Sequence, residues 1–167
     1  ALPYLYFLSD QVGETVYLGE RRDDEVATVL HVFSPSSREQ MHWYDRLPLH
    51  CSSSGKVLLA HAEESDVAAV LEQGLPGYTE HTITDPVAFR AELTRVRQQG
   101  YAVDFGEYQL GANAIAVPVL NTGGAVVAAL VVLGPAYTFT RDKAMASLER
   151  LKAVSREITT KLAAGSS

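Results

Sequence analysis

Residues 114–133 read AIAVPVLNTGGAVVAALVVL, and this stretch decides the fold. Two apolar runs, at 114–120 and 125–133, flank the turn-forming sequence NTGG. Short apolar runs joined by a tight Asn/Gly turn are typical of a β-hairpin. The stretch therefore predicts two paired antiparallel strands, around which the other elements can be placed.

Four more strands are predicted, three of them near the N-terminus, where the hydrophobic pattern repeats every second residue. They cover residues 15–18, 25–33, 39–44 and 101–105. Turn residues separate the first three strands. We therefore expect consecutive antiparallel pairing in this part of the chain.

Five helices are predicted from apolar residues at helical spacing. The clearest follows Asp85 and Pro86, an N-cap and first-turn pair, and is closed by Gly100. The others end at Gly13, cover 57–61, end at Gly74 and run from the N-cap Thr140 to Leu162. The order is helix, three strands, three helices, three strands and helix. This order predicts an α+β fold with a mainly antiparallel six-stranded sheet flanked by helices.

The composition fits a single globular domain. The chain has 167 residues, 47% hydrophobic and 20% charged, which excludes disorder, collagen and coiled coil. Its longest apolar run is far below the ~20 residues of a membrane helix. The lone Cys51 cannot form an internal disulfide, so a cytoplasmic protein is expected, with no membrane partner. A net charge of −6 disfavours nucleic-acid binding by this chain itself.

Three segments are expected along the chain. Residues 1–13 are interpreted as the end of a helix that connects to a preceding part of a longer protein, because the helical pattern begins at the first residue. Residues 14–164 are expected to form the domain. Residues 165–167, Gly-Ser-Ser, are interpreted as a cloning remnant.

Residues 52–56, SSSGK, lead directly into a predicted helix. The first N–H groups of a helix lack partners, so this segment is a candidate site for a carboxylate. It is not a nucleotide-binding loop, because His50 occupies the position of the first glycine of that motif. The alternative is a helix that is merely capped by serine.

Catalysis and metal binding are not expected. No Gly-x-Ser-x-Gly elbow is present, and the five histidines show no metal-ligand spacing. Asp104 lies in a predicted strand, where it faces either solvent or the core; in the core it needs a hydrogen-bond partner or a ligand hydroxyl.

Three stretches together resemble the C-terminal effector-binding domain of IclR-family transcriptional regulators. They are LPLHCSSSGKVLLA at 47–60, GYAVD at 100–104, and AVPV at 116–119, which leads through Gly123 and Gly124 to VVAAL at 126–130. TITDP at 82–86 falls between the first two. The resemblance covers nearly the whole chain and implies a fold similar to GAF and profilin domains.

The resemblance also implies partners. Family members bind operator DNA through an N-terminal winged helix-turn-helix, which this chain lacks, and bind a small organic acid effector through a domain such as this one. It implies a homodimer or a tetramer, and no cofactor. The implied effector-binding residues are Ser53, Ser54, Gly55, Asp104, Ala114, Val131, Leu133, Leu47, Met41 and Trp43.

Departures from the family pattern suggest the kind of effector. Val131 and Leu133 stand where serines are frequent in the family, and Ala114 follows Asn113 where an Arg-Cys pair is common. Fewer hydroxyls and more apolar surface predict a larger, partly apolar carboxylic acid, such as an aromatic acid. Two alternatives stay open: a small hydrolase that uses Ser54 or Cys51, and an interaction domain with a closed core.

Overall fold

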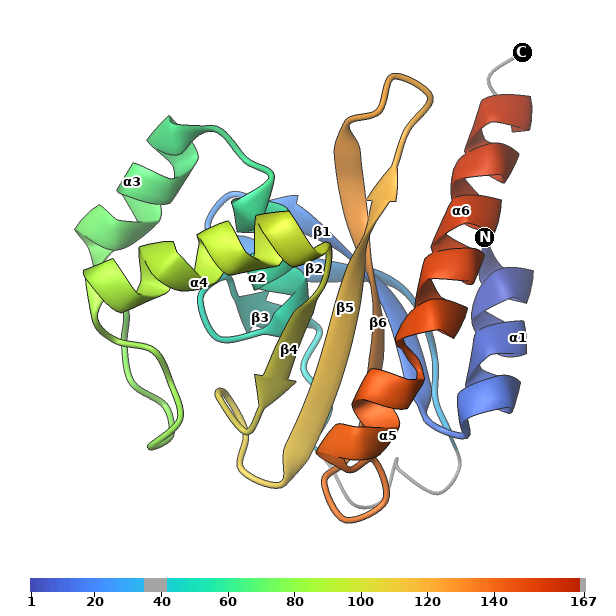
Figure 1. Cartoon of the computed structure of the whole chain (residues 1–167), viewed down its shortest axis with the longest axis horizontal. Helices are drawn as coiled ribbons and strands as arrows, with labels where there is room; N and C mark the ends of the chain where they lie inside the picture. Colours follow the sequence, from blue (N-terminus) through green and yellow to red (C-terminus); the bar gives the residue numbers. More distant parts are fainter. Residues whose placement is uncertain (35–41, 166–167) are drawn as a thin grey trace.

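The computed structural model describes residues 1–34 and 42–165, which form a six-stranded antiparallel sheet between two layers of helices (Figure 1). The strands are β1 (Thr15–Arg22), β2 (Glu25–Val32), β3 (Arg46–Pro48), β4 (Ala102–Phe105), β5 (Ala112–Leu120) and β6 (Val126–Pro135). The helices are α1 (Leu2–Val12), α2 (Ser53–Ala60), α3 (Glu64–Gln73), α4 (Pro86–Gln99), α5 (Arg141–Ala146) and α6 (Leu148–Gly165). The prediction of an α+β fold with a six-stranded antiparallel sheet is confirmed.

The predicted hairpin forms the centre of the sheet, whose strand order is β3-β2-β1-β6-β5-β4. β5 and β6 pair along their whole lengths, from Ala112 opposite Pro135 to Leu120 opposite Val126. The side chain of Asn121 closes the turn, because its Oδ1 accepts the N–H groups of Gly123 (2.9 Å) and Ala125 (3.0 Å). β1 then adds to the free edge of β6 and joins the two halves of the sheet.

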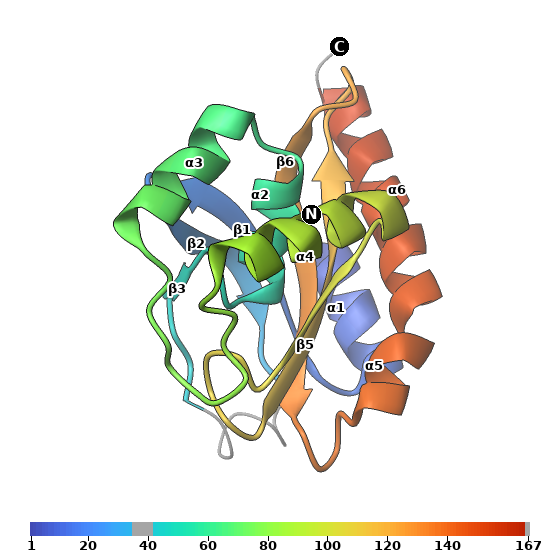
Figure 2. The ribbon, with the colours of Figure 1, turned by 60° about the vertical axis from the view of Figure 1, so that its left-hand side comes forward.

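Both faces of the sheet are covered. Helices α1, α5 and α6 lie on one face, and α2, α3 and α4 lie on the other (Figures 1 and 2). In β6 the alternation is plain: Leu130 and Val132 pack on the α1, α5 and α6 side, whereas Ala129 and Val131 pack on the α2 side. All four are fully buried. A strand with two buried faces is apolar throughout, which explains the continuous run in the sequence.

The prediction of a third strand at 39–44 is wrong in its described part. Residues 42–44 have no regular secondary structure, and the strand that pairs with β2 is the short β3, Arg46–Pro48. Trp43 is instead an aromatic packing residue, in edge contact with Tyr17 at a centroid distance of 5.7 Å. Residues 39–41, including the candidate Met41, lie outside the described residues.

The prediction of one long C-terminal helix is also corrected. Thr140 caps the helix as expected, since its Oγ1 accepts the N–H of Lys143 at 3.2 Å. The helix is interrupted at Ser147, however, which separates α5 from α6. The Ser147 hydroxyl donates to the carbonyl of Ala144 at 2.6 Å, and such a side-chain bond competes with the helical backbone pattern.

Helix α4 follows its sequence signals closely. Asp85 Oδ2 accepts the N–H of Ala88 at 2.9 Å, Pro86 opens the helix, and Gly100 ends it with a φ of 85°. Phe89, Leu93 and Val96 form its buried face.

Across the described part of the chain, no helix combines the length and the hydrophobicity needed to span a membrane.

Candidate functional site

Strand register places three of the candidate residues in one row across the sheet. Asp104 pairs with Ala114, and Ala114 pairs with Leu133 on its other side. Because side chains directly opposite each other share a face, the three point together toward the α2 side. Asp104 is 9% exposed, so it faces the core rather than the solvent, and the small Ala114 leaves space beside it.

The N-terminus of α2 lies against this row. Ser52 is the N-cap: its Oγ accepts the N–H of Gly55 at 3.1 Å and donates to the carbonyl of Pro48 at 2.7 Å. A Cβ at Gly55 would collide with the backbone of Leu49, so only glycine allows this close approach. Among the described residues, the N–H groups of Ser53 and Ser54 have no partner and remain available at the helix N-terminus.

A small cavity lies between the helix N-terminus and the sheet. Its volume is about 30 Å³, which is room for about two water molecules. Its walls are mainly aromatic and apolar. The lining residues are Tyr17, His42, Trp43, Tyr44, Leu47, Ser52, Ser53, Asp104, Tyr108, Gln109, Ala112, Ala114 and Leu133.

Three hydroxyl groups in this region have contrasting environments. The Ser53 hydroxyl is buried, and its Oγ has no hydrogen-bond partner among the described residues. The Tyr17 hydroxyl and Ser54 Oγ lie 3.0 Å apart and hydrogen-bond to each other. An unpartnered buried hydroxyl is costly, so Ser53 Oγ is the polar atom in the cavity wall that is ready to accept a new partner.

Asp104 has unusual electrostatics for a carboxyl group. Burial and the nearby charge of Glu107 raise the pKa of Asp104 to about 7. The shift is limited by the Glu107 N–H, which donates to Asp104 Oδ1 at 2.7 Å, and by the charge of Lys56. Near neutral pH the group can therefore accept a hydrogen bond from a ligand hydroxyl or, when protonated, donate one.

Lys56 fixes the surroundings of Asp104. Its fully buried ammonium group donates to Glu107 (2.7 Å), Glu92 (3.1 Å) and the carbonyl of Val103 (2.5 Å). Burial alone would lower the pKa of Lys56, but the carboxylates of Glu107 and Glu92 raise it. Lys56 therefore stays charged and ties α2 to α4 and to the loop after β4.

The structure brings together some of the residues predicted from sequence and separates others. Cavity walls include Ser53, Asp104, Ala114, Leu133, Leu47 and Trp43. Three others are outside the lining: Ser54 is bonded to Tyr17, Gly55 packs on Leu49, and Val131 is part of the core under α2. Met41 is not among the described residues.

The sequence analysis missed several wall residues. Tyr17, Tyr44, Tyr108 and Gln109 line the cavity, as do His42 and Ala112. Tyr17 lies on the same face as the candidate row, two residues along β1 from the position opposite Leu133, and pairs with Val131. A pattern analysis of single strands could not place it, because the position depends on the pairing of β1 with β6.

The arrangement does not support nucleophilic catalysis. Ser54 Oγ is bonded to a tyrosine, and Cys51 is fully buried, with a pKa raised first by burial and then by the charge of Asp104. Neither has a histidine as a bonded base in the described part of the chain. Within residues 1–34 and 42–165, no group of three or more His, Cys, Asp and Glu side chains could hold a metal ion.

Comparison with known proteins identifies the family to which this fold belongs. The sequence profile of the bacterial transcriptional regulator IclR C-terminal family matches residues 1–160. The chain is 35% identical over 162 residues to the HTH-type transcriptional repressor AllR of Salmonella typhi, covering 96% of this chain and 60% of that protein. The chain belongs to the IclR family and corresponds to its C-terminal effector-binding domain.

Two solved structures are similar over almost the whole chain. One is an IclR homolog from Microbacterium hydrocarbonoxydans complexed with 4-hydroxybenzoate (32% identity, TM-score 0.87, 98% of this chain and 67% of that one). The other is a double mutant of the PobR inducer-binding domain from Acinetobacter in complex with 3-hydroxybenzoic acid (30% identity, TM-score 0.87, 95% of each chain).

Proposed function

We propose that this domain binds a small, partly apolar carboxylic acid, of the aromatic hydroxy-acid class, in the cavity beside α2. The observation that carries the proposal is the buried Ser53 hydroxyl, which has no partner among the described residues and lies at the N-terminus of α2. A helix N-terminus attracts an anion, and here it adjoins a polar group in need of a partner.

The rest of the cavity wall suits the body of such an acid. The ligand carboxylate meets Ser53 and the free N–H groups of the first helical turn. Its ring packs on Leu133 and Ala114 among the aromatic wall residues, and a ring hydroxyl donates to Asp104. The hydroxybenzoate complexes of the two similar proteins support this choice of ligand class.

Binding requires movement, because a cavity of about 30 Å³ cannot hold a benzoate ring. Ligand sites typically enclose roughly 300–1,000 Å³. In the full-length protein, which carries the DNA-binding part, the effector acts by binding the DNA-bound and free forms with different affinity. As the resemblance implies, the functional unit is a homodimer or a tetramer, and the lone Cys51 favours a cytoplasmic location.

A thermal-shift screen of this domain against aliphatic and aromatic carboxylic acids tests the proposal. A ligand present at a hundredfold over its Kd adds about 2.7 kcal/mol of stability, which raises Tm by roughly 5 °C or more. We expect hydroxybenzoates to stabilise the domain and Ser53→Ala to abolish the effect. Leu133→Ser should weaken binding by ~1 to 3 kcal/mol. If none of the acids raises Tm, the alternative of an interaction domain with a closed core is favoured.

A further inference from the structure

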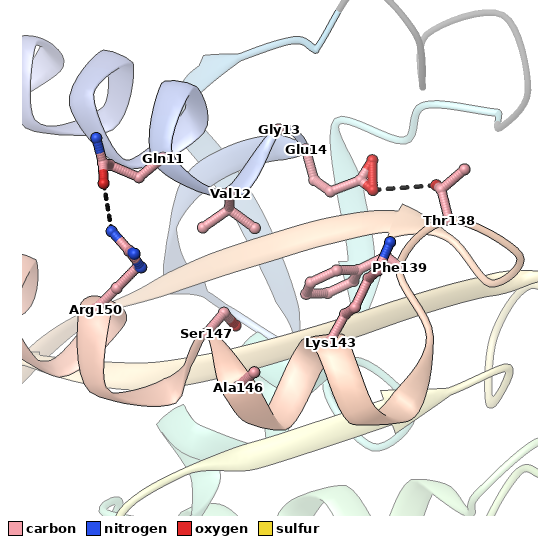
Figure 3. A pocket seen from close by; sticks show the side chains of 10 residues that line it. All are labelled: Gln11, Val12, Gly13, Glu14, Thr138, Phe139, Lys143, Ala146, Ser147 and Arg150. Carbon is pink, nitrogen blue, oxygen red and sulfur yellow. Dashed lines mark hydrogen bonds between the residues drawn. The ribbon is translucent and has the colours of Figure 1, made fainter.

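A second, larger pocket lies on the opposite face of the sheet, where α1 ends and α5 gives way to α6 (Figure 3). Its volume is about 340 Å³, within the range of small-molecule sites. Its lining residues are Gln11, Val12, Gly13, Glu14, Thr138, Phe139, Lys143, Ala146, Ser147 and Arg150. None of them belongs to the cavity beside α2.

One wall of this pocket carries a buried carboxylate. Glu14 is 5% exposed, and its Oε2 accepts the Thr138 hydroxyl at 3.2 Å. A Cβ at Gly134 would lie 2.5 Å from Glu14 Oε2, so the glycine leaves the room that the carboxylate occupies. Among the described residues, no Lys, Arg or His nitrogen lies within 4 Å of Glu14.

The opposite wall carries two cations from the C-terminal helices. Lys143 of α5 extends toward Glu14, and Arg150 of α6 donates to the side-chain oxygen of Gln11 in α1 (Figure 3). In the described part of the chain, neither cation has a carboxylate within 4 Å. The partly buried Val12 supplies apolar surface between the charged groups, and the buried Phe139 packs beneath the pocket.

This distribution of charge selects a ligand that carries both signs. A simple anion would be attracted by Lys143 and Arg150 but repelled by Glu14. A simple cation would be attracted by Glu14 but repelled by Lys143 and Arg150. A compact zwitterion satisfies all three groups, and an apolar side chain can cover Val12.

We propose that this pocket binds an α-amino acid with an aliphatic side chain, with its carboxylate on Lys143 and Arg150 and its ammonium group on Glu14. The bound molecule joins the end of α1 to α5 and α6. The site is separate from the cavity proposed for the organic acid, so the two can be occupied together.

Calorimetric titration of this domain with L-leucine tests the proposal. The matched controls are its two halves, 4-methylpentanoate, which lacks the amine, and 3-methylbutylamine, which lacks the carboxylate. We expect leucine to bind at least tenfold more tightly than either half. Glu14→Gln and Lys143→Ala should each weaken binding about tenfold, whereas Lys152→Ala, on α6 outside the pocket, should leave it unchanged.

Two further readouts separate this site from the first. Ser53→Ala should bind leucine normally, and leucine should slow amide hydrogen exchange in α1 of the wild-type chain. The proposal is wrong if leucine does not bind, if it binds no better than its halves, or if Glu14→Gln binds it as tightly as the wild type. In those cases Lys143 serves only as a long-range counter-charge for Glu14.

Discussion

Asp104 is a buried carboxyl group on the cavity wall, and its charge depends on two neighbours, Lys56 and Glu107. Strand alternation leaves two choices for its side chain, toward solvent or toward the core. Pairing with Ala114, under the N-terminus of α2, selects the core. Its neighbours Lys56 and Glu107 then set its charge, and these come from a helix and a loop that no local pattern connects.

The raised pKa of Asp104 predicts a pH-dependent stability. An unfolded aspartate titrates near ~3.9, whereas burial raises the pKa of Asp104 to about 7 in the folded chain. The folded state therefore holds the proton more strongly, and the free energy of unfolding falls as the pH rises from about 4 to about 7. Over this range the titration of Asp104 lowers the free energy of unfolding by an amount on the order of 4 kcal/mol.

Urea unfolding of the wild type and Asp104→Asn across this pH range isolates the effect. The asparagine keeps an oxygen for the Glu107 N–H but does not titrate. The stability of the wild type relative to the variant should fall toward about pH 7 and then level off. A difference that stays constant with pH would contradict the assignment.

Gly55 gives a second prediction at the residue scale. Alanine is favoured over glycine in a helix by about 1 kcal/mol. At this position, however, the new Cβ meets the backbone of Leu49, which cannot move aside as a side chain could. We expect Gly55→Ala to lower the free energy of unfolding by about 2 kcal/mol or more. Gly77→Ala, whose Cβ meets only Thr84 Cγ2 at 3.4 Å, should change it by less than about 0.5 kcal/mol.

At the scale of elements, the sequence predicts best where a local signal suffices. The central hairpin follows from Asn121 and its flanking apolar runs, and α4 follows from Asp85 and Gly100. The third strand was misplaced because the strand that pairs with β2 is only three residues long, Arg46–Pro48, too short to show a period. The division of α5 from α6 was missed because it depends on a single side-chain bond at Ser147.

The loop between β4 and β5 closes the cavity on one side. It begins at Gly106 and ends at Gly111, both with positive φ (78° and 82°). Its Tyr108 ring lies in the cavity wall and packs edge-on against Tyr44 (5.0 Å) and Tyr78 (4.8 Å). Tyr108 also lines an outer groove of about 380 Å³. It is therefore the partition between a cavity that is too small for a ligand and an open groove.

Removal of this partition should change ligand access. If the domain binds hydroxybenzoates as proposed, Tyr108→Ala should raise the association rate of 4-hydroxybenzoate about tenfold, because the conformational step that slows entry is reduced. It should also favour longer arylalkanoic acids over benzoates. Stopped-flow measurement of the association rate tests this prediction. The control is Tyr137→Ala, which removes an exposed tyrosine outside the cavity and should leave the rate unchanged. If the wild type, Tyr108→Ala and Tyr137→Ala have equal association rates and the same ligand preference, Tyr108 does not control entry to the cavity.

At the scale of the whole molecule, the sheet separates the two proposed sites. The cavity proposed for an organic acid lies on the α2 side, and the pocket proposed for an amino acid lies on the α1, α5 and α6 side. Composition and element order predicted the fold class, but they did not predict the face of the sheet on which each site lies. The strand order of the sheet brings β1, β3, β4, β5 and β6 together beside α2 to form the cavity, and it places Tyr17 in the wall. The other aromatic wall residues come from the segments before β3 and between β4 and β5.

Trp43 allows the central claim to be tested directly, because it is the single tryptophan of the chain and lies in the cavity wall. Titration with 4-hydroxybenzoate, followed by tryptophan fluorescence, should give a saturable change in the wild type. Ser53→Ala, with the same tryptophan and the same ligand absorbance, should show no saturable change at the same concentrations. A wild-type signal that does not respond, or a Ser53→Ala titration identical to that of the wild type, would contradict binding of the acid at the N-terminus of α2.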